Sequence, residues 1–280
     1  MIIDTLVNNV RKACGYQFPR LGKLGFNILS NLIFISVPSH IRCELFHGLL
    51  VNLNLRDATQ FSTFYLGDRF EFPTALVLND WGGDSFFDIG ANYGFYSFLM
   101  LHQLRDVTVY AFEPNPITFR QLESTKSANS LDGLNIFNCG LGSIRECLEI
   151  HPGVDDSGHS TFLNHPELAC RSLGKVPVTT FDTWTQDHEI SYPDNPAWVA
   201  KIDVEGMELS VLRGMERALT RKAFKGICIE VLEHTLALNG HQPQDIFQFL
   251  DKFGYHPITQ EKLIKKYGRS STMNVFFVPN

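Results

Sequence analysis

The chain has 280 residues, 44% of them hydrophobic, with a formal net charge of -6 and a pI near 5.9. This length suits one catalytic-sized domain with an N-terminal extension. The charge argues against nucleic acid as the main partner, because duplex binding needs a basic face toward the phosphates and no segment supplies one. A small molecule or a neutral polymer fits better.

The N-terminal stretch 1–42 has a loosely amphipathic, helical pattern. Its apolar run 24–37 follows several basic residues and superficially resembles a signal peptide. A bilayer of about 30 Å needs roughly 20 apolar residues, so this run is too short to span it, and no small-x-small cleavage site follows. We expect a helix that packs on the main domain, with membrane-surface contact as the alternative. The run could also form a dimer surface, although no motif specifies an oligomeric state.

The cysteines are scattered, without a C-x-x-C pair or a zinc-type Cys–His spacing. They are Cys14, Cys43, Cys139, Cys147, Cys170 and Cys228. This pattern predicts reduced, mostly buried thiols and a cytoplasmic protein.

From residue 85 onward, extended apolar runs alternate with helical patterns, which predicts a parallel sheet with helices on both faces. Before it, the alternation of apolar residues over 43–55 predicts strand. The expected sheet strands are 85–89, 107–112, 134–139, 197–202, 226–231 and, at the end of the chain, 273–278. Expected helices follow Asn115-Pro116, span 209–219 and open at Gln242-Pro243. The region 146–180 interrupts the alternation with two short strands and a polar loop at 155–161, and such insertions tend to carry function.

The rest of the chain is organised around residues 86–94. An apolar strand stops at Asp88 and breaks into Gly90 and Gly94 before a new helix begins. Glycines let the backbone approach a ligand closely, and the helix start presents unpaired N–H groups. The alternative is simple turn chemistry.

Glu113 ends the next strand, where a ribose presents its two hydroxyls to an acidic residue. A solvated carboxylate before a helix start is the alternative. Asp88 and Asn92 flank Gly90, and an acidic turn would repel a pyrophosphate. A cofactor with a sulfonium and an ammonium group and without phosphate suits the turn better, which favours S-adenosylmethionine.

Five motifs in order now resemble the FkbM family of S-adenosylmethionine-dependent methyltransferases. They are 88–97, 111–116, 178–182, 201–214 and 229–231. The resemblance covers about 67–258 and implies an α/β, Rossmann-like doubly wound class I methyltransferase sheet of seven strands, the last antiparallel. It divides the chain into an extension over 1–66, helical and then short strands, and a methyltransferase domain over 67–280.

The resemblance also implies cofactor-binding residues. The methionine end would meet Asp88, Gly90, Asn92 and Gly94, and Glu113, followed by Pro114 and Asn115, would hold the ribose. Gly140 would lie near the adenine, although 139–142 also reads as a plain glycine turn. Asp203 is the last of the expected cofactor-binding residues.

Asp203 and Glu205 follow the fourth strand and would project to the same side if the strand stayed extended. Methyl transfer to a hydroxyl needs a group that accepts its proton. Asp203 is our first candidate for base or substrate orienter and Glu205 the second, unless the pair only orders the turn. His234 and His159 are the rival bases. No dedicated metal spacing is present, although Asp203, Glu205 and Glu233 together could suit magnesium.

The sequence therefore predicts an S-adenosylmethionine-dependent O-methyltransferase that acts on a hydroxyl of a small-molecule sugar, a glycan or a natural product. An NAD-dependent oxidoreductase is the second hypothesis, since Glu113 also suits that cofactor, and its weakness is the incomplete glycine fingerprint. A non-catalytic binding module on the same fold is the third.

Overall fold

The computed structural model describes residues 39–46, 48–67, 70–152, 160–162, 172–268, 271 and 273–280. The helix expected at 24–37, His159 and most of the polar loop at 155–161 lie outside these residues. Within the described part of the chain, no helix combines the length and the apolar character needed to cross a membrane.

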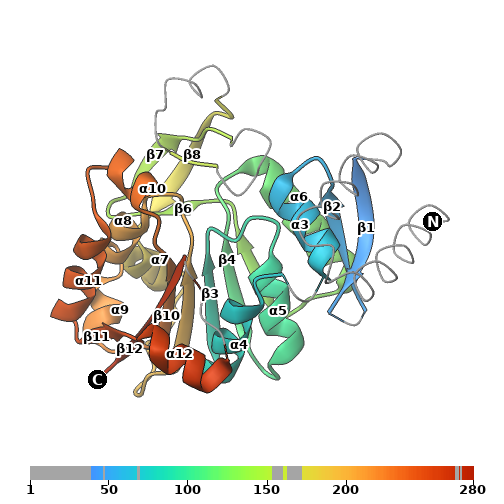
Figure 1. Ribbon diagram of the computed structural model, residues 1–280. Helices are drawn as coiled ribbons and strands as arrows, with labels where there is room; N and C mark the ends of the chain where they lie inside the picture. Colours follow the sequence, from blue (N-terminus) through green and yellow to red (C-terminus); the bar gives the residue numbers. More distant parts are fainter. Residues whose placement is uncertain are drawn as a thin grey trace.

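The centre of the molecule is a seven-stranded sheet in the order β11-β12-β10-β9-β3-β4-β5 (Figure 1). The strands are β3 (Ser85–Ile89), β4 (Thr108–Phe112), β5 (Leu134–Phe137), β9 (Trp198–Ile202), β10 (Phe224–Glu230), β11 (Tyr255–Pro257) and β12 (Asn274–Pro279). Strands β5, β4, β3, β9 and β10 run parallel, and β12 is antiparallel to β10. The expected seven-stranded class I sheet with an antiparallel last strand is confirmed.

Alternate residues of each buried strand face opposite sides of the sheet, so the core has two parts. Phe86 and Val199 belong to one cluster, and their neighbours Phe87 and Ala200 belong to the other. Helices α4 (Phe72–Trp81), α5 (Phe95–Gln103), α6 (Pro116–Asn129) and α12 (Gln260–Tyr267) cover the first side. Helices α7 (Phe181–Asp187), α8 (Glu208–Arg213), α9 (Glu216–Thr220), α10 (Glu233–Leu238) and α11 (Pro243–Lys252) cover the second. The doubly wound arrangement is visible in Figure 1.

Two small sheets flank the central one. A hairpin of β1 (His40–Leu45) and β2 (Leu49–Asn54) leads into α3 (Ala58–Leu66), and its buried residues join the first core cluster. This hairpin accounts for the strand pattern over 43–55. The second small sheet consists of β6 (Gly140–Leu141), β8 (Lys175–Thr179) and β7 (Glu146–Glu149).

The single helix expected over 209–219 is wrong, because the chain forms α8 and α9 with a break at Gly214. A Cβ atom at this glycine would lie 2.1 Å from the carbonyl oxygen of Gly142. The close approach of a distant loop therefore fixes the break, and helical spacing alone does not reveal it.

Candidate active site

A cavity of about 360 Å³ opens at the carboxyl ends of β3, β4, β9 and β10. Small-molecule sites in proteins occupy roughly 300–1,000 Å³ and, in open α/β sheets, lie at this edge. The register of the strands explains which residues lie together at this cavity. Ile202 pairs with Ile89 on one side and with Ile229 on the other, so the next residues, Gly90, Asp203 and Glu230, end three adjacent strands.

The turn after β3 lies tightly against the end of β9. Asp203 N–H donates to the Ile89 carbonyl at 2.9 Å, and Gly90 has a φ of +84°. A Cβ atom at Gly90 would lie 1.8 Å from the Asp203 carbonyl oxygen. Glycine is therefore required here, both by the left-handed backbone and by the contact. The absence of a side chain therefore lets the turn pack directly on the end of β9, and Gly90 lines the cavity from there.

Glu113 ties this turn to the end of β4. One carboxylate oxygen accepts the Asn92 backbone N–H and the other accepts that of Asn115, both at 2.7 Å. The side chain is 5% exposed, and its burial raises the pKa of Glu113 to about 7 although the two N–H groups act in the opposite direction. The carboxylate still lines the cavity, at the position expected for a ribose contact.

Asp88 lies behind the cavity wall. Its carboxylate accepts the Ser97 backbone N–H at 2.9 Å and the Ser97 hydroxyl at 2.6 Å. Burial raises the pKa of Asp88 to about 6, against the effect of these bonds and of Lys201. This placement differs from the expected contact with the cofactor, because the start of α5 already occupies the carboxylate. Asp88 thus positions α5 and the turn before it.

The other residues expected to bind the cofactor also fall into two groups, those that line the cavity and those that lie behind its wall. Those that line the cavity are Gly90, Asn92, Glu113, Pro114, Gly140 and Asp203. Gly94 instead begins α5 with a φ of +98°. Asn115 caps α6 by accepting the Ile117 N–H, and its amide donates to Ser160. Gly94 and Asn115 therefore shape the wall from behind.

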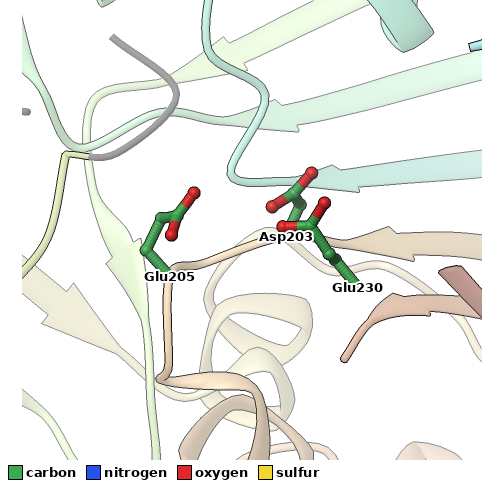
Figure 2. Close-up of side chains that lie close together, drawn as sticks. All are labelled: Asp203, Glu205 and Glu230. Atoms are coloured by element: carbon green, nitrogen blue, oxygen red, sulfur yellow. The ribbon is translucent and has the colours of Figure 1, made fainter. Parts of the chain in front are cut away.

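Three carboxylates gather at the cavity: Asp203, Glu205 and Glu230 (Figure 2). One oxygen atom of each lies within 4.8 Å of those of the other two. The strand does not stay extended from Asp203 to Glu205, since β9 ends at Ile202 and Glu205 has a left-handed φ of 51°. The turn itself brings the two side chains to the same space.

Glu230 is a site residue that the sequence motifs did not assign. The signal was available, because Glu230 directly follows the apolar end of β10 just as Glu113 follows that of β4. Burial, and next the charge of Asp203, raise the pKa of Glu230. This side chain therefore keeps its proton to a higher pH than an ordinary glutamate.

Lys201 supports the carboxylates from below the cavity floor. Its side chain is 1% exposed, and Nζ lies 2.9 Å from Asp203 Oδ2. Burial disfavours the ammonium, but the Asp203 carboxylate, together with Cys228 and Glu230, raises the pKa of Lys201 overall. A buried cation thus accompanies Asp203, whereas the pKa of Glu230 is raised by burial and by Asp203.

The three carboxylates are also the described residues whose spacing could suit a metal ion with oxygen ligands. Glu230 takes the place expected for Glu233, which is exposed on α10. His234 is likewise exposed on α10 and does not line the cavity. Among the described residues, the proton acceptors at the cavity are therefore carboxylates.

The sheet order and the cavity at its carboxyl edge define a class I methyltransferase fold. The chain belongs to the FkbM methyltransferase family, because the family described as "Methyltransferase FkbM domain" matches residues 88–257. This membership confirms S-adenosylmethionine as the cofactor and makes the NAD alternative wrong. The residues fit that group, since Gly90 and Asn92 bring the backbone of the turn to the cavity, Glu113 suits the ribose, and carboxylates suit the sulfonium and ammonium charges.

Curated relatives are similar over part of their length. "Methyltransferase 1" of Beauveria bassiana is 28% identical over 153 residues, which are 48% of this chain and 59% of the relative. "Hexuronic acid methyltransferase AglP" of Haloferax volcanii is 28% identical over 172 residues, 60% of this chain and 62% of the relative. The chain thus spans less than two thirds of either relative.

A similar solved structure is the Pyrococcus abyssi tRNA (uracil-54, C5)-methyltransferase in complex with S-adenosyl-L-homocysteine. It has a TM-score of 0.42 and 11% identity over 86% of this chain and 44% of that one.

Proposed function

We propose that the protein transfers the methyl group of S-adenosylmethionine to a hydroxyl group of a sugar, a glycan or a natural product. The observation that carries the proposal is the Asp203–Glu230 carboxyl pair at the cavity, with Lys201 beneath it. The sugar is supported by the name of the Haloferax volcanii relative alone.

The bound cofactor supplies an electrophilic methyl group on its sulfonium. Glu113 would accept hydrogen bonds from the ribose hydroxyls, and the turn at Gly90 would lie against the methionine end. The remaining task of the chain is to hold the acceptor hydroxyl in line with that methyl group and to take its proton.

Asp203 is the proposed base. Two neighbouring carboxyl groups whose environments differ commonly take different roles in proton transfer. Asp203 is paired with Lys201 and would accept the hydroxyl proton, whereas the protonated Glu230 could donate a hydrogen bond that orients the acceptor oxygen. Glu205 also lines the cavity and remains the second candidate base.

Asp203→Asn tests this assignment. Methyl transfer from labelled S-adenosylmethionine to a panel of glycosides should fall by about 10²–10⁴-fold, the usual contribution of a positioned base. S-adenosylhomocysteine affinity should persist, and Asp194→Asn, at an exposed position in the loop before β9, serves as the matched control. Full turnover in Asp203→Asn would remove Asp203 from the mechanism. A wild-type chain that binds the cofactor and methylates nothing would favour the binding-module alternative.

We also propose that the protein works in the cytoplasm and without nucleic acid as a partner. The first is supported by the cysteines of the described chain at 43, 139, 147 and 228, which are free thiols. The second rests on the net charge of -6.

A further inference from the structure

The cavity has two halves of different origin. The family-matched residues 88–257 supply the cofactor half. Segments before and after that stretch, from α3, the start of α4 and β12, supply the half that the cofactor leaves to the acceptor. The candidate bases Asp203 and Glu205 stand on the turn 203–207 after β9, outside any helix or strand. Their positions therefore depend on the contacts that hold this turn.

The backbone of the turn has a conformation that needs outside support. Glu205 has a φ of 51°, in the left-handed region that residues other than glycine rarely adopt. Gly206 follows with a φ of +98°, and a Cβ atom there would lie 2.5 Å from the Thr235 carbonyl oxygen. A left-handed residue such as Glu205 persists only where the surrounding structure fixes it.

Glu208, the first residue of α8, supplies such a contact. Its Oε1 atom accepts the backbone N–H of Val204 at 3.2 Å and that of Gly206 at 3.1 Å. These two residues lie on either side of Glu205. The Glu208 side chain is 2% exposed, and burial raises the pKa of Glu208 to about 6, while the N–H groups of the turn act in the opposite direction. The carboxylate is thus kept in an unfavourable place by its bonds to the turn.

The other carboxylate oxygen of Glu208 takes no part in this arrangement. Oε2 is buried and makes no hydrogen bond within the described part of the chain. Glu208 is also not among the residues that line the cavity. One oxygen atom, directed at the turn, therefore accounts for the hydrogen bonds of this side chain. Asn239 supports the same turn by donating its amide to the Gly206 carbonyl at 2.7 Å.

We propose that Glu208 is a positioning residue for methyl transfer, because its Oε1 atom holds the turn that presents Asp203 and Glu205 to the acceptor hydroxyl. The inference rests on the proposed function and adds the residue on which the placement of the candidate bases depends. A displacement of about 1 Å at a reacting group can lower the rate by about 10²-fold. Removing the Oε1 acceptor should therefore lower kcat although it leaves the residues that line the cavity in the chain.

Two substitutions separate the acceptor atom from the rest of the side chain. Glu208→Leu removes both oxygens, whereas Glu208→Gln keeps an acceptor toward the turn and places its amide where Oε2 has no partner. Methyl transfer from labelled S-adenosylmethionine to the panel of glycosides should show a kcat about 10–100-fold lower in Glu208→Leu. In Glu208→Gln, kcat should stay within about threefold of wild type. The KM for the acceptor and the S-adenosylhomocysteine affinity should stay within about threefold in both variants.

Amide hydrogen exchange of the ligand-free chain reports on the turn without an acceptor. In Glu208→Leu, the Val204 and Gly206 amides lose their acceptor and should exchange about tenfold faster or more than in the wild type. In Glu208→Gln they should exchange at nearly the wild-type rate.

Asp182 provides the matched control. Its carboxylate also accepts two backbone N–H groups at the start of a helix, those of Arg217 and Ala218, but Asp182 does not line the cavity. Asp182→Ala should lower the melting temperature and leave both kcat and the exchange of the Val204 and Gly206 amides unchanged.

Glu208→Asp serves if Glu208→Leu does not fold, because it keeps the charge but is one methylene shorter than the reach to both N–H groups requires. It should then show the lower kcat and the faster exchange. Wild-type kcat and wild-type exchange in the variant that lacks the acceptor would overturn the inference. So would a loss of kcat in Glu208→Gln as large as that in Glu208→Leu.

The two proposals fail in different ways. A wild-type chain that methylates no glycoside contradicts the proposed function, and the exchange rates of Val204 and Gly206 then decide by themselves whether Glu208 holds the turn. Methylation by the wild type together with an unchanged kcat in Glu208→Leu contradicts the positioning role alone.

Discussion

The two halves of the cavity are built in different ways. Backbone groups shape the cofactor half: Gly90 is fixed by the Asp203 carbonyl, and Glu113 by two N–H groups. Side chains from α3, from the start of α4 and from β12 shape the acceptor half. The cofactor half therefore depends on a few positions that tolerate little change, whereas the acceptor half can vary its side chains without disturbing the sheet.

The largest effect is expected from Gly90→Ala. The added Cβ would lie 1.8 Å from the Asp203 carbonyl at a φ of +84°, so the turn must move. We expect a loss of roughly 3 kcal/mol or more in the free energy of unfolding, together with the loss of cofactor binding. Gly240→Ala is the control, because its φ of +72° is also left-handed but no atom lies within 4 Å of the new Cβ. It should cost only about 1–2 kcal/mol. Similar losses in chemical denaturation would show that the contact at Gly90 is unimportant.

The raised pKa of Glu113 predicts that the free energy of unfolding depends on pH. Its folded pKa of about 7 lies above the ordinary value of 4.5, so the folded state binds this proton more tightly than the unfolded state. The resulting stabilisation is complete below about pH 4.5 and is lost as the pH rises through 7, by roughly 3 kcal/mol. Denaturant titrations of the cofactor-free chain at several pH values should show this decline. Glu113→Gln should flatten it, and parallel curves for both proteins would contradict the assignment.

The same variant should weaken cofactor binding. Glu113→Gln removes a charge-assisted acceptor for the ribose and places an amide N–H against one of the two backbone donors. S-adenosylhomocysteine affinity should fall about 10–100-fold, the range expected when a hydrogen bond to a charged group is lost. Unchanged affinity by calorimetry would place the ribose elsewhere.

The smallest effect on cofactor affinity is expected from a substitution in the acceptor half. Ser62→Ala removes a hydroxyl from α3 at the cavity. It should leave S-adenosylhomocysteine affinity within twofold while raising the KM for the acceptor. A large loss of cofactor affinity would show that the two halves are not separate.

The sequence was informative where a role depends on neighbouring residues. The turn at Gly90 and the carboxylate at Glu113 follow from a strand end and a helix start, and the structure places both at the cavity. The orientation of the Asp88 side chain depends on its hydrogen bond with Ser97 in the next helix, and the spacing of residues in the sequence does not reveal this bond. Strand β11 has only three residues, too few for a pattern.

The acceptor half could not be predicted, because its residues meet only in the folded chain. Glu71 and Asn274 are more than 200 positions apart in the sequence, yet both line the cavity. Glu230 meets Asp203 through the register of β9 and β10. These contacts arise from tertiary packing, and local sequence carries only their residue types.

The most direct test of the cofactor site is a thermal-shift comparison of S-adenosylmethionine with NAD. At a concentration 100 times its dissociation constant, a ligand stabilises the folded state by about 2.7 kcal/mol. S-adenosylmethionine should therefore raise the melting temperature of the wild-type chain, and NAD should leave it unchanged. A rise with NAD and none with S-adenosylmethionine would contradict the account.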